Sequence, residues 1–266
     1  MKLSEISRET IKAKKTVLIF RLRTGGAVFL FLLSFSYVVT ALLFGQSAAY
    51  GRREENDRSR IMVWAGAGET QFVLDMEDYL IGCLAGSIPA EYEPEALQAQ
   101  AVLLRTLLIR EYKESVEQGR TQAGILVTDA RGYRNREQLK QMWGADFAVN
   151  YGKICSAVAK TRGIYLTYRG EPILASYFRV SSGRTRDGRE LAGNAAGTGE
   201  GYPYLQSVLC PKDYLSEDYL QGGRAAGLGH GLGMSQFGAN EMAKSGADRD
   251  EILHYFFTDI TIDKFE

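Results

Sequence analysis

The chain is 266 residues long, and its 32 acidic side chains balance its 32 lysines and arginines. This length allows one large domain or two small ones with a buried core, and the balanced charge gives no overall field that attracts nucleic acid. Three cysteines permit at most one internal disulfide. The chain has two histidines and no CxxC or HxxxH pair, so it lacks the closely spaced ligands of a zinc site. We therefore expect no nucleic-acid partner, no metal site and no cofactor.

An uncharged run of twenty residues extends from Gly26 to Gly45. As a helix it spans about 30 Å, the thickness of a bilayer's hydrocarbon core. Lysines and arginines precede it, so the positive-inside rule predicts a cytoplasmic N-terminus at residues 1–24, an anchor in the cytoplasmic membrane at 25–45 and a single-pass protein. Residues 46–60 are charged and read as a linker, which leaves 61–262 as an extracytoplasmic domain. A cleavable signal peptide is the alternative, since Ser47 and Ala49 are small, but its apolar run is usually about 7–15 residues.

The folded part begins with strands expected at 61–64 and 71–74, joined as a hairpin across AGAGE. A short amphipathic turn follows, broken at Gly86 and Pro89. A long helix then starts at Pro94, because the fixed φ of proline suits a first helical turn. Its apolar residues recur at helical spacing and occupy most of its circumference, which predicts a central, buried helix.

The second half of the chain mixes short strands and helices. We expect a strand at 125–128, helices at 135–143 and 147–160, and a hairpin over 164–178 that turns at 169–171. A glycine- and serine-rich run covers 180–201. Helices are expected at 234–244 and, behind an Asp248 cap, at 250–256, with a last strand at 259–262. The predicted fold class is therefore α+β, with mixed helices and short strands around one long buried helix, preceded by a single N-terminal transmembrane helix.

Two stretches are candidates for function. Residues 87–95 carry three carboxylates, at Glu91, Glu93 and Glu95, and either line a cleft or only lead into the core helix. Residues 229–238 read GHGLGMSQFG, which lacks the glycine spacing of a dinucleotide loop and the lysine of a Walker loop. What this run offers is His230, which is poorly packed by its glycine neighbours and suits a role as proton handler or hydrogen-bond donor.

Four stretches carry a family resemblance: EDYLIGCLAGSIPAEYEPEALQAQAVLLRT at 77–106, PILASYFRVSSGRT at 172–185, YPYLQSVLCPKD at 202–213, and GHGLGMSQFGANEMAKSGADRDEILHYFFTDITI at 229–262. In this order they resemble the stage II sporulation protein D family of bacterial cell-wall enzymes. The resemblance implies a lytic transglycosylase-like domain that acts on peptidoglycan glycan strands stripped of their peptides during endospore formation.

The resemblance also implies site residues. The family's catalytic acid is a glutamate just ahead of a Met-Pro pair, and in this chain Ser87 of AGSIP holds that position. A serine hydroxyl cannot supply a proton of the needed acidity. His230 keeps its motif position, as do the residues that would line a glycan cleft: Arg105, Thr106, Tyr177, Ser181, Gly183, Thr185, Ser235 and Gln236.

Other positions depart from the family pattern. Phe178 stands where many members have histidine, and TDARGYRNREQ at 128–138 lacks the histidine and cysteine that may bind zinc in some members. The region from 213 to 228 is shortened. Three hypotheses follow: a pseudoenzyme that binds glycan strands or a membrane-anchored wall-remodelling partner, a divergent lytic transglycosylase that uses Glu91 as acid and base, or a domain that only holds partners together.

Overall fold

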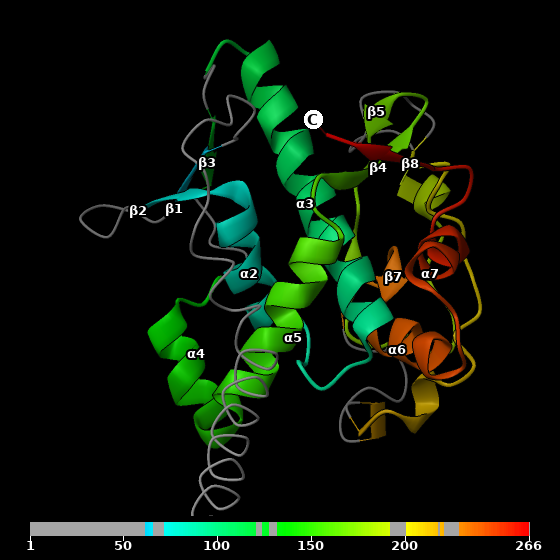
Figure 1. The fold of residues 1–266 in the computed structure, drawn as a ribbon. Helices are drawn as coiled ribbons and strands as arrows, with labels where there is room; N and C mark the ends of the chain where they lie inside the picture. Colours follow the sequence, from blue (N-terminus) through cyan, green and yellow to red (C-terminus); the bar gives the residue numbers. More distant parts are fainter. Residues whose placement is uncertain are drawn as a thin grey trace, which may run out of the picture. The chain divides into compact units, whose positions relative to one another are not determined.

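The computed structural model describes residues 62–65, 72–120, 124–127, 132–191, 201–217, 219–220 and 229–265 (Figure 1). The chain divides into two compact units, residues 1–56 and 57–266, and all the described residues belong to the second. The predicted tail, anchor and linker over residues 1–60 lie outside the described residues. Within the described part, no helix is both long and apolar enough to cross a membrane.

The first sheet has three strands in the order β2-β1-β3. Strands β1 (Met62–Ala65) and β2 (Phe72–Asp75) pair antiparallel, with Val63 opposite Leu74. The predicted hairpin is thus confirmed, shifted by one residue at each strand. Strand β3 (Gly124–Val127) returns after two helices and pairs parallel with β1, where a strand at 125–128 was expected.

Helix α2 (Met76–Ser87) corrects the prediction of a short turn that breaks at Gly86. Gly86 remains part of the helix, and its lack of a side chain leaves room for another segment. A Cβ at this position would lie 1.9 Å from the carbonyl oxygen of Gly132. One turn earlier, a Cβ on Gly82 would lie 2.4 Å from the ring of Tyr133. The two glycines therefore act through close packing, and the segment after β3 crosses the C-terminal half of α2.

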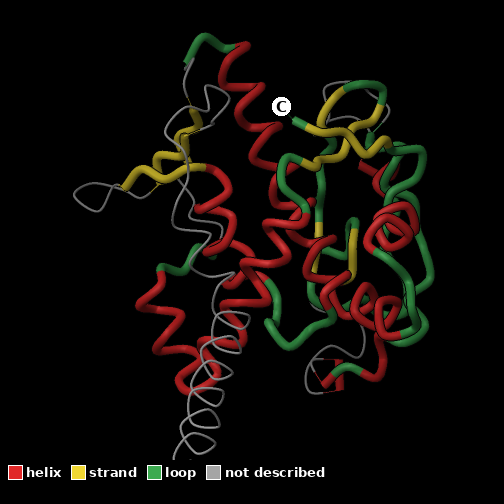
Figure 2. Tube along the Cα trace, in the orientation of Figure 1, coloured by secondary structure: helices red, strands yellow, loops and turns green. Residues whose placement is uncertain are grey.

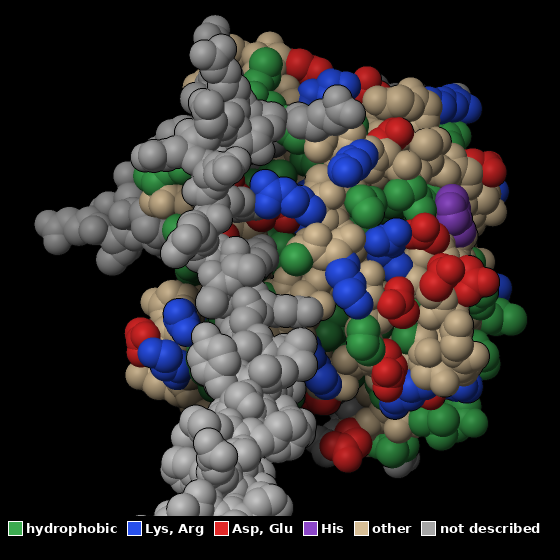
Figure 3. All heavy atoms as spheres, in the orientation of Figure 1, with side chains coloured by type: hydrophobic (Ala, Val, Ile, Leu, Met, Phe, Trp, Pro, Cys, Tyr) green, Lys and Arg blue, Asp and Glu red, His purple; other side chains and the backbone are tan. Residues whose placement is uncertain are grey.

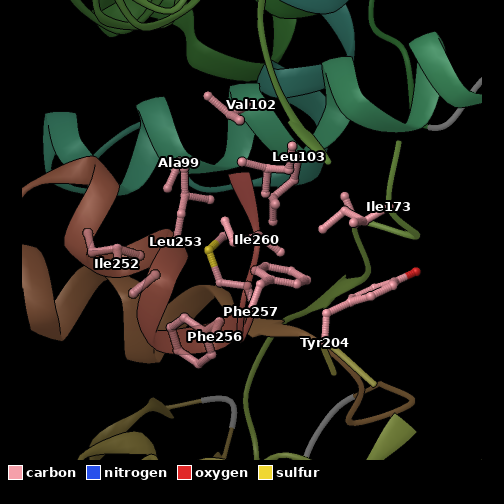
Figure 4. Packing of buried hydrophobic residues seen from close by; sticks show 14 of the residues in the cluster. Ala99, Val102, Leu103, Ile173, Tyr204, Ile252, Leu253, Phe256, Phe257 and Ile260 are labelled. Atoms are coloured by element: carbon pink, nitrogen blue, oxygen red, sulfur yellow. The ribbon is translucent and has the colours of Figure 1, made fainter. Parts of the chain in front are cut away.

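Helix α3 (Pro94–Glu117) is the predicted central helix, with Pro94 in its first turn. Its 24 residues span about 36 Å. Figure 4 shows Ala99 and Leu103 of this helix packed toward Leu253 and Phe257 of the C-terminal region. These apolar contacts are the main stabilising term of the core, and they fix α3 as the element against which the other segments pack.

Two helices and a short 3₁₀ turn follow β3. Helix α4 (Arg136–Trp143) has a capping box in which Asn135 and Gln138 bond each other's backbone N–H, and η2 (Gly144–Asp146) leads to α5 (Phe147–Lys160). Both helices were predicted at these positions. Figure 2 shows α5 as a helix that crosses beside α2 and α3.

The second sheet has the order β5-β4-β8, with strands β4 (Ile164–Tyr168), β5 (Glu171–Pro172) and β8 (Thr261–Lys264). The hairpin expected over 164–178 is only partly correct, because its second strand breaks after Pro172. The N–H of Leu174 donates to the hydroxyl of Tyr204 at 2.8 Å, away from the ladder. The chain then forms β6 (Tyr177–Phe178), which pairs parallel with β7 (Met234–Ser235).

The C-terminal helices are α6 (Gln236–Lys244) and α7 (Arg249–Phe256). Helix α6 starts two residues later than predicted because Ser235 is its cap and accepts a hydrogen bond from the N–H of Gly238 at 3.1 Å. Asp248 caps α7 as expected. Short 3₁₀ turns, η3 (Gly188–Leu191) and η4 (Asp213–Leu215), interrupt the connecting loops. The architecture is the predicted α+β class around one long buried helix.

Candidate functional site

The turn between α2 and α3 lies against the start of α6. Ser87 is the last residue of α2, and its main-chain carbonyl accepts a hydrogen bond from Nε2 of Gln236 at 2.8 Å. The hydroxyl of Ser87 donates back to the carbonyl of Leu84 at 3.2 Å. The structure therefore brings together the two stretches that the sequence marked as functional, and it directs the Ser87 hydroxyl to its own helix.

The side-chain amide of Gln100 also contacts Gln236. Gln100 of α3 is fully buried, and its Oε1 lies 3.3 Å from Nε2 of Gln236. Within the described residues, Nε2 of Gln100 has no hydrogen-bond partner. The polar atoms of buried amides normally all have hydrogen-bond partners. The pair of Gln100 and Gln236 therefore forms a polar site inside the apolar core, in contact with the last residue of α2.

The three carboxylates of the turn have different surroundings. Glu91 is exposed, whereas Glu95 is held at the start of α3 by the N–H of Arg249 at 3.1 Å and by the amide of Gln98 at 2.7 Å. Glu93 is fixed through its own N–H, which donates to Asn240 of α6 at 2.8 Å. Glu91 is thus the carboxylate of this turn that faces solvent.

A cavity of about 270 Å³ opens beside this turn, between the first residues of α3 and the helix α5. Leu97 and Gln98 line it from α3, and Lys153, Ser156 and Lys160 line it from α5. Both lysines are exposed. The cavity can therefore take a polar ligand that carries negative charge.

His230 lies on the loop that precedes β7. Its Nδ1 accepts a hydrogen bond from the N–H of Leu232 at 3.1 Å, and its ring lies 6.0 Å from that of Phe178. Partial burial lowers the pKa of the imidazole, the charge of Arg186 lowers it further, and a hydrogen bond with the backbone of Tyr177 opposes both. The neutral form of the imidazole is therefore favoured, and its Nδ1 serves as a hydrogen-bond acceptor.

Asp213 is a central residue that the sequence reasoning did not select. Its fully buried carboxylate accepts hydrogen bonds from the N–H of Ser181 at 2.6 Å and from the hydroxyl of Ser235 at 2.7 Å. Burial raises the pKa of Asp213 despite these donors. The residue joins three sequence motifs, and its place at the end of YPYLQSVLCPKD was the signal that could have identified it.

Arg105 and Thr106 lie in the core of the domain. Arg105 is fully buried, and its guanidinium forms two 2.8 Å hydrogen bonds with the carboxylate of Glu77. The hydroxyl of Thr106 accepts a hydrogen bond from the N–H of Leu166 at 3.0 Å. These two side chains tie α3 to α2 and β4, and both are fully buried.

The remaining predicted residues shape the loops. Tyr177 lies in β6 opposite Met234, and Gly183 adopts a φ of 107°, which favours glycine. Thr185 is buried, and its hydroxyl accepts a hydrogen bond from the N–H of Val208 at 2.9 Å. Hydrogen bonds thus join Ser181 and Ser235 to Asp213, and the next residue after Ser235, Gln236, bonds Ser87, while Thr185 belongs to a separate loop contact.

The charges of the described surface are mixed. Figure 3 shows lysines and arginines interspersed with aspartates and glutamates on the face drawn. In the described part of the chain, no group of three or more histidine, cysteine, aspartate or glutamate side chains could hold a metal ion. The side chains described at the site are amides, hydroxyls, one imidazole, two lysines and the carboxylates of Glu91, Glu95 and Asp213.

Comparison with known proteins gives consistent matches. A family model described as "Stage II sporulation protein" matches residues 67–168. The stage II sporulation protein D of Bacillus amyloliquefaciens is 30% identical in an alignment that covers 71% of this chain and 74% of that protein. The protein of the same name from Bacillus subtilis strain 168 is 29% identical in an alignment that covers 74% of this chain and 77% of that protein.

Proposed function

The chain belongs to the stage II sporulation protein D family, and we propose that it acts in sporulation by binding peptide-free glycan strands of the cell wall without cutting them. The observation that carries this proposal is the side chain at the end of α2. Ser87 holds the place at which the family resemblance puts the catalytic glutamate, and its hydroxyl donates to the carbonyl of Leu84.

The reaction of a lytic transglycosylase requires a carboxyl group at that place. The acid first protonates the glycosidic oxygen, and the resulting carboxylate then takes a proton from the 6-hydroxyl of the sugar, which closes an anhydro ring. A serine hydroxyl is far too weak an acid for the first step. The neutral His230 is a hydrogen-bonding group, so it does not replace the missing acid.

The surroundings of Ser87 favour retained binding. Peptide-free strands carry a carboxylate wherever a peptide has been removed, and the cavity beside the α2–α3 turn offers Lys153 and Lys160. The buried amides of Gln236 and Gln100 keep the end of α2 in place. A site that holds its shape without its acid is suited to recognition.

Placement at the membrane completes the proposal. Residues 25–45 would anchor the domain at the outer side of the cytoplasmic membrane, with residues 1–24 in the cytoplasm. A glycan-binding domain in this position can hold strands close to other membrane-anchored wall-remodelling proteins, which are the partners we propose.

The proposal is tested by measuring how the full-length chain binds purified strands with and without their peptides. We expect preferential binding of peptide-free strands that weakens with added salt, since the attraction to the α5 lysines is screened. The double substitution Lys153→Ala and Lys160→Ala should weaken binding several-fold, while Lys140→Ala on α4 should leave it unchanged. Equal binding by both lysine variants and wild type would contradict the location of the site.

The alternative is a divergent lytic transglycosylase that uses Glu91. Its support is that Glu91 lies in the same turn, four residues after Ser87, with an exposed carboxylate. Exposure argues against it, because an acid that also serves as base needs a sheltered position. If the wild-type chain released anhydro sugars and Glu91→Gln did not, the alternative would replace our proposal.

A further inference from the structure

A second cavity lies at the other end of α3 and is unrelated to Ser87. Its volume is about 390 Å³, and it is enclosed by the last turns of α3, the β4–β5 hairpin and the segment 201–204. Arg110, the first α3 residue in its lining, is about 24 Å along the helix axis from Pro94. The cavity is therefore a separate site, and its volume falls within the range of about 300–1,000 Å³ typical of ligand pockets.

Three tyrosines form one side of this cavity. The ring of Tyr204 lies 5.3 Å from that of Tyr168 and 6.0 Å from that of Tyr202, and both pairs are tilted. The hydroxyl of Tyr204 is fixed by the N–H of Leu174 at 2.8 Å. Tyr202 and Tyr204 belong to the YPYL stretch, which the site at Ser87 does not use. Because Tyr202 and Tyr204 are buried in the core, they fix the position of Tyr168, whose half-buried ring is the one that a ligand can reach.

Pairs of opposite charge form the rest of the lining. Arg110 pairs with Glu114 at 2.9 Å, and Lys113 pairs with Glu171 of β5. All four side chains are partly exposed. Arg169 and Glu117 complete the charged lining, so three cations face three carboxylates and the cavity offers no net charge to an anion. It offers hydrogen-bond donors and acceptors side by side.

A guanidinium also covers one of the rings. Arg169, at the tip of the β4–β5 turn, lies 5.0 Å from the ring centre of Tyr168. Its φ of 54° is in the left-handed region, and its exposed side chain is part of the lining of the cavity. A ligand ring can take the place of this exposed guanidinium on the face of Tyr168.

We propose that this cavity is a second sugar site, which binds an uncharged N-acetylhexosamine oligosaccharide. The C–H face of a pyranose ring is apolar and packs on a tyrosine, whereas its hydroxyl and acetamido groups need neighbouring donors and acceptors such as the two ion pairs. The inference rests on the proposed function, because glycan strands supply this class of sugar. A second site would let one domain hold a strand away from the lysine-lined cavity.

The test measures binding of the β-1,4-linked tetramer of N-acetylglucosamine to the full-length chain by calorimetry. Tyr168→Ala should weaken binding roughly tenfold, the size expected for a lost aromatic contact. Arg169→Asn and Glu171→Gln change exposed side chains without removing core packing, and each should weaken binding several-fold. Tyr255→Ala, which removes an exposed tyrosine on α7 outside the cavity, is the matched control and should bind as wild type does.

The same experiment separates this inference from the proposed function. The inference requires that Lys153→Ala with Lys160→Ala leaves tetramer binding intact, even though that double variant loses affinity for peptide-free strands. It is overturned if the tetramer does not bind, if Arg169→Asn and Glu171→Gln bind as wild type does, or if excess inorganic phosphate displaces the tetramer. None of these results decides whether charged strands bind at Lys153 and Lys160, because that binding is measured separately.

Discussion

The side-chain amide of Gln236 donates a hydrogen bond to the main-chain carbonyl of Ser87 at 2.8 Å, across 149 residues of sequence. This contact fixes the end of α2 to the start of α6. We expect Gln236→Leu to leave the Ser87 carbonyl unbonded, to lower the free energy of unfolding by about 1–3 kcal/mol and to weaken glycan binding. Denaturant unfolding and strand binding measure the two effects.

A control for stability alone exists on β4. Thr167 is also buried, and its hydroxyl bonds the carboxylate of Asp263 at 2.5 Å, away from Ser87 and from the lysine-lined cavity. Thr167→Val should lower stability and leave strand binding unchanged. Equal loss of binding in both variants would mean that Gln236 acts only through stability.

The buried ion pair between Glu77 and Arg105 is predicted to contribute strongly to the stability of the fold. The side chain of Arg105 is fully buried, with both carboxylate oxygens of Glu77 at 2.8 Å. Glu77→Gln leaves a buried guanidinium without a counter-charge, which should cost about 3–5 kcal/mol of unfolding free energy. Glu114→Gln breaks the exposed pair with Arg110 and should cost less than about 1 kcal/mol. Similar losses in the two variants would refute a structural role for Arg105.

Asp213 should make stability depend on pH. Burial raises the pKa of its carboxyl above the usual 3.8, so the folded chain binds this proton more tightly than the unfolded chain does. The contribution of Asp213 is therefore complete below the unfolded pKa and is lost as pH rises through the folded pKa. Relative to wild type, Asp213→Asn should gain stability as pH rises from about 4 to 7. A constant difference across that range would show that Asp213 is not perturbed.

His230 should titrate in the opposite sense. Its pKa is lowered from 6.5, first by burial and then by Arg186, so its neutral form is favoured in the folded chain. Its contribution to stability is present above the unfolded pKa and is lost as pH falls through the lowered folded pKa. An NMR titration, with the signal assigned by its loss in His230→Asn, should give a midpoint below 6.5. A midpoint at or above that value would contradict the neutral role.

Most elements of the fold could be predicted because their signals are local. The apolar period behind Pro94 predicted α3, and the cap at Asp248 marked the start of α7. The errors came from long-range packing. From sequence alone Gly86 is interpreted as a helix breaker, whereas in the structure it lies within the helix and allows the backbone of Gly132 to approach closely. The strand ends after Pro172 because the N–H of Leu174 bonds to the hydroxyl of Tyr204, which lies 30 residues after Leu174 in the chain.

The candidate site was predictable in outline only. The motif containing Ser235 and Gln236 was identified, but its contact with Ser87 depends on tertiary structure. Asp213 was missed because a lone aspartate in a loop carries no pattern, and its importance comes from three segments that meet around it. Arg105 was expected to line a cleft, since sequence alone cannot distinguish a buried ion pair from a ligand contact.

The measurement that tests the central claim most directly is an incubation of the full-length chain with peptide-free glycan strands, followed by mass spectrometry of the products. We predict that the strands are bound and recovered without new anhydro termini, because Ser87 supplies no acid. Ser87→Glu, measured in parallel, reports whether the rest of the site can still support cleavage. Anhydro termini produced by the unmodified chain would contradict the account.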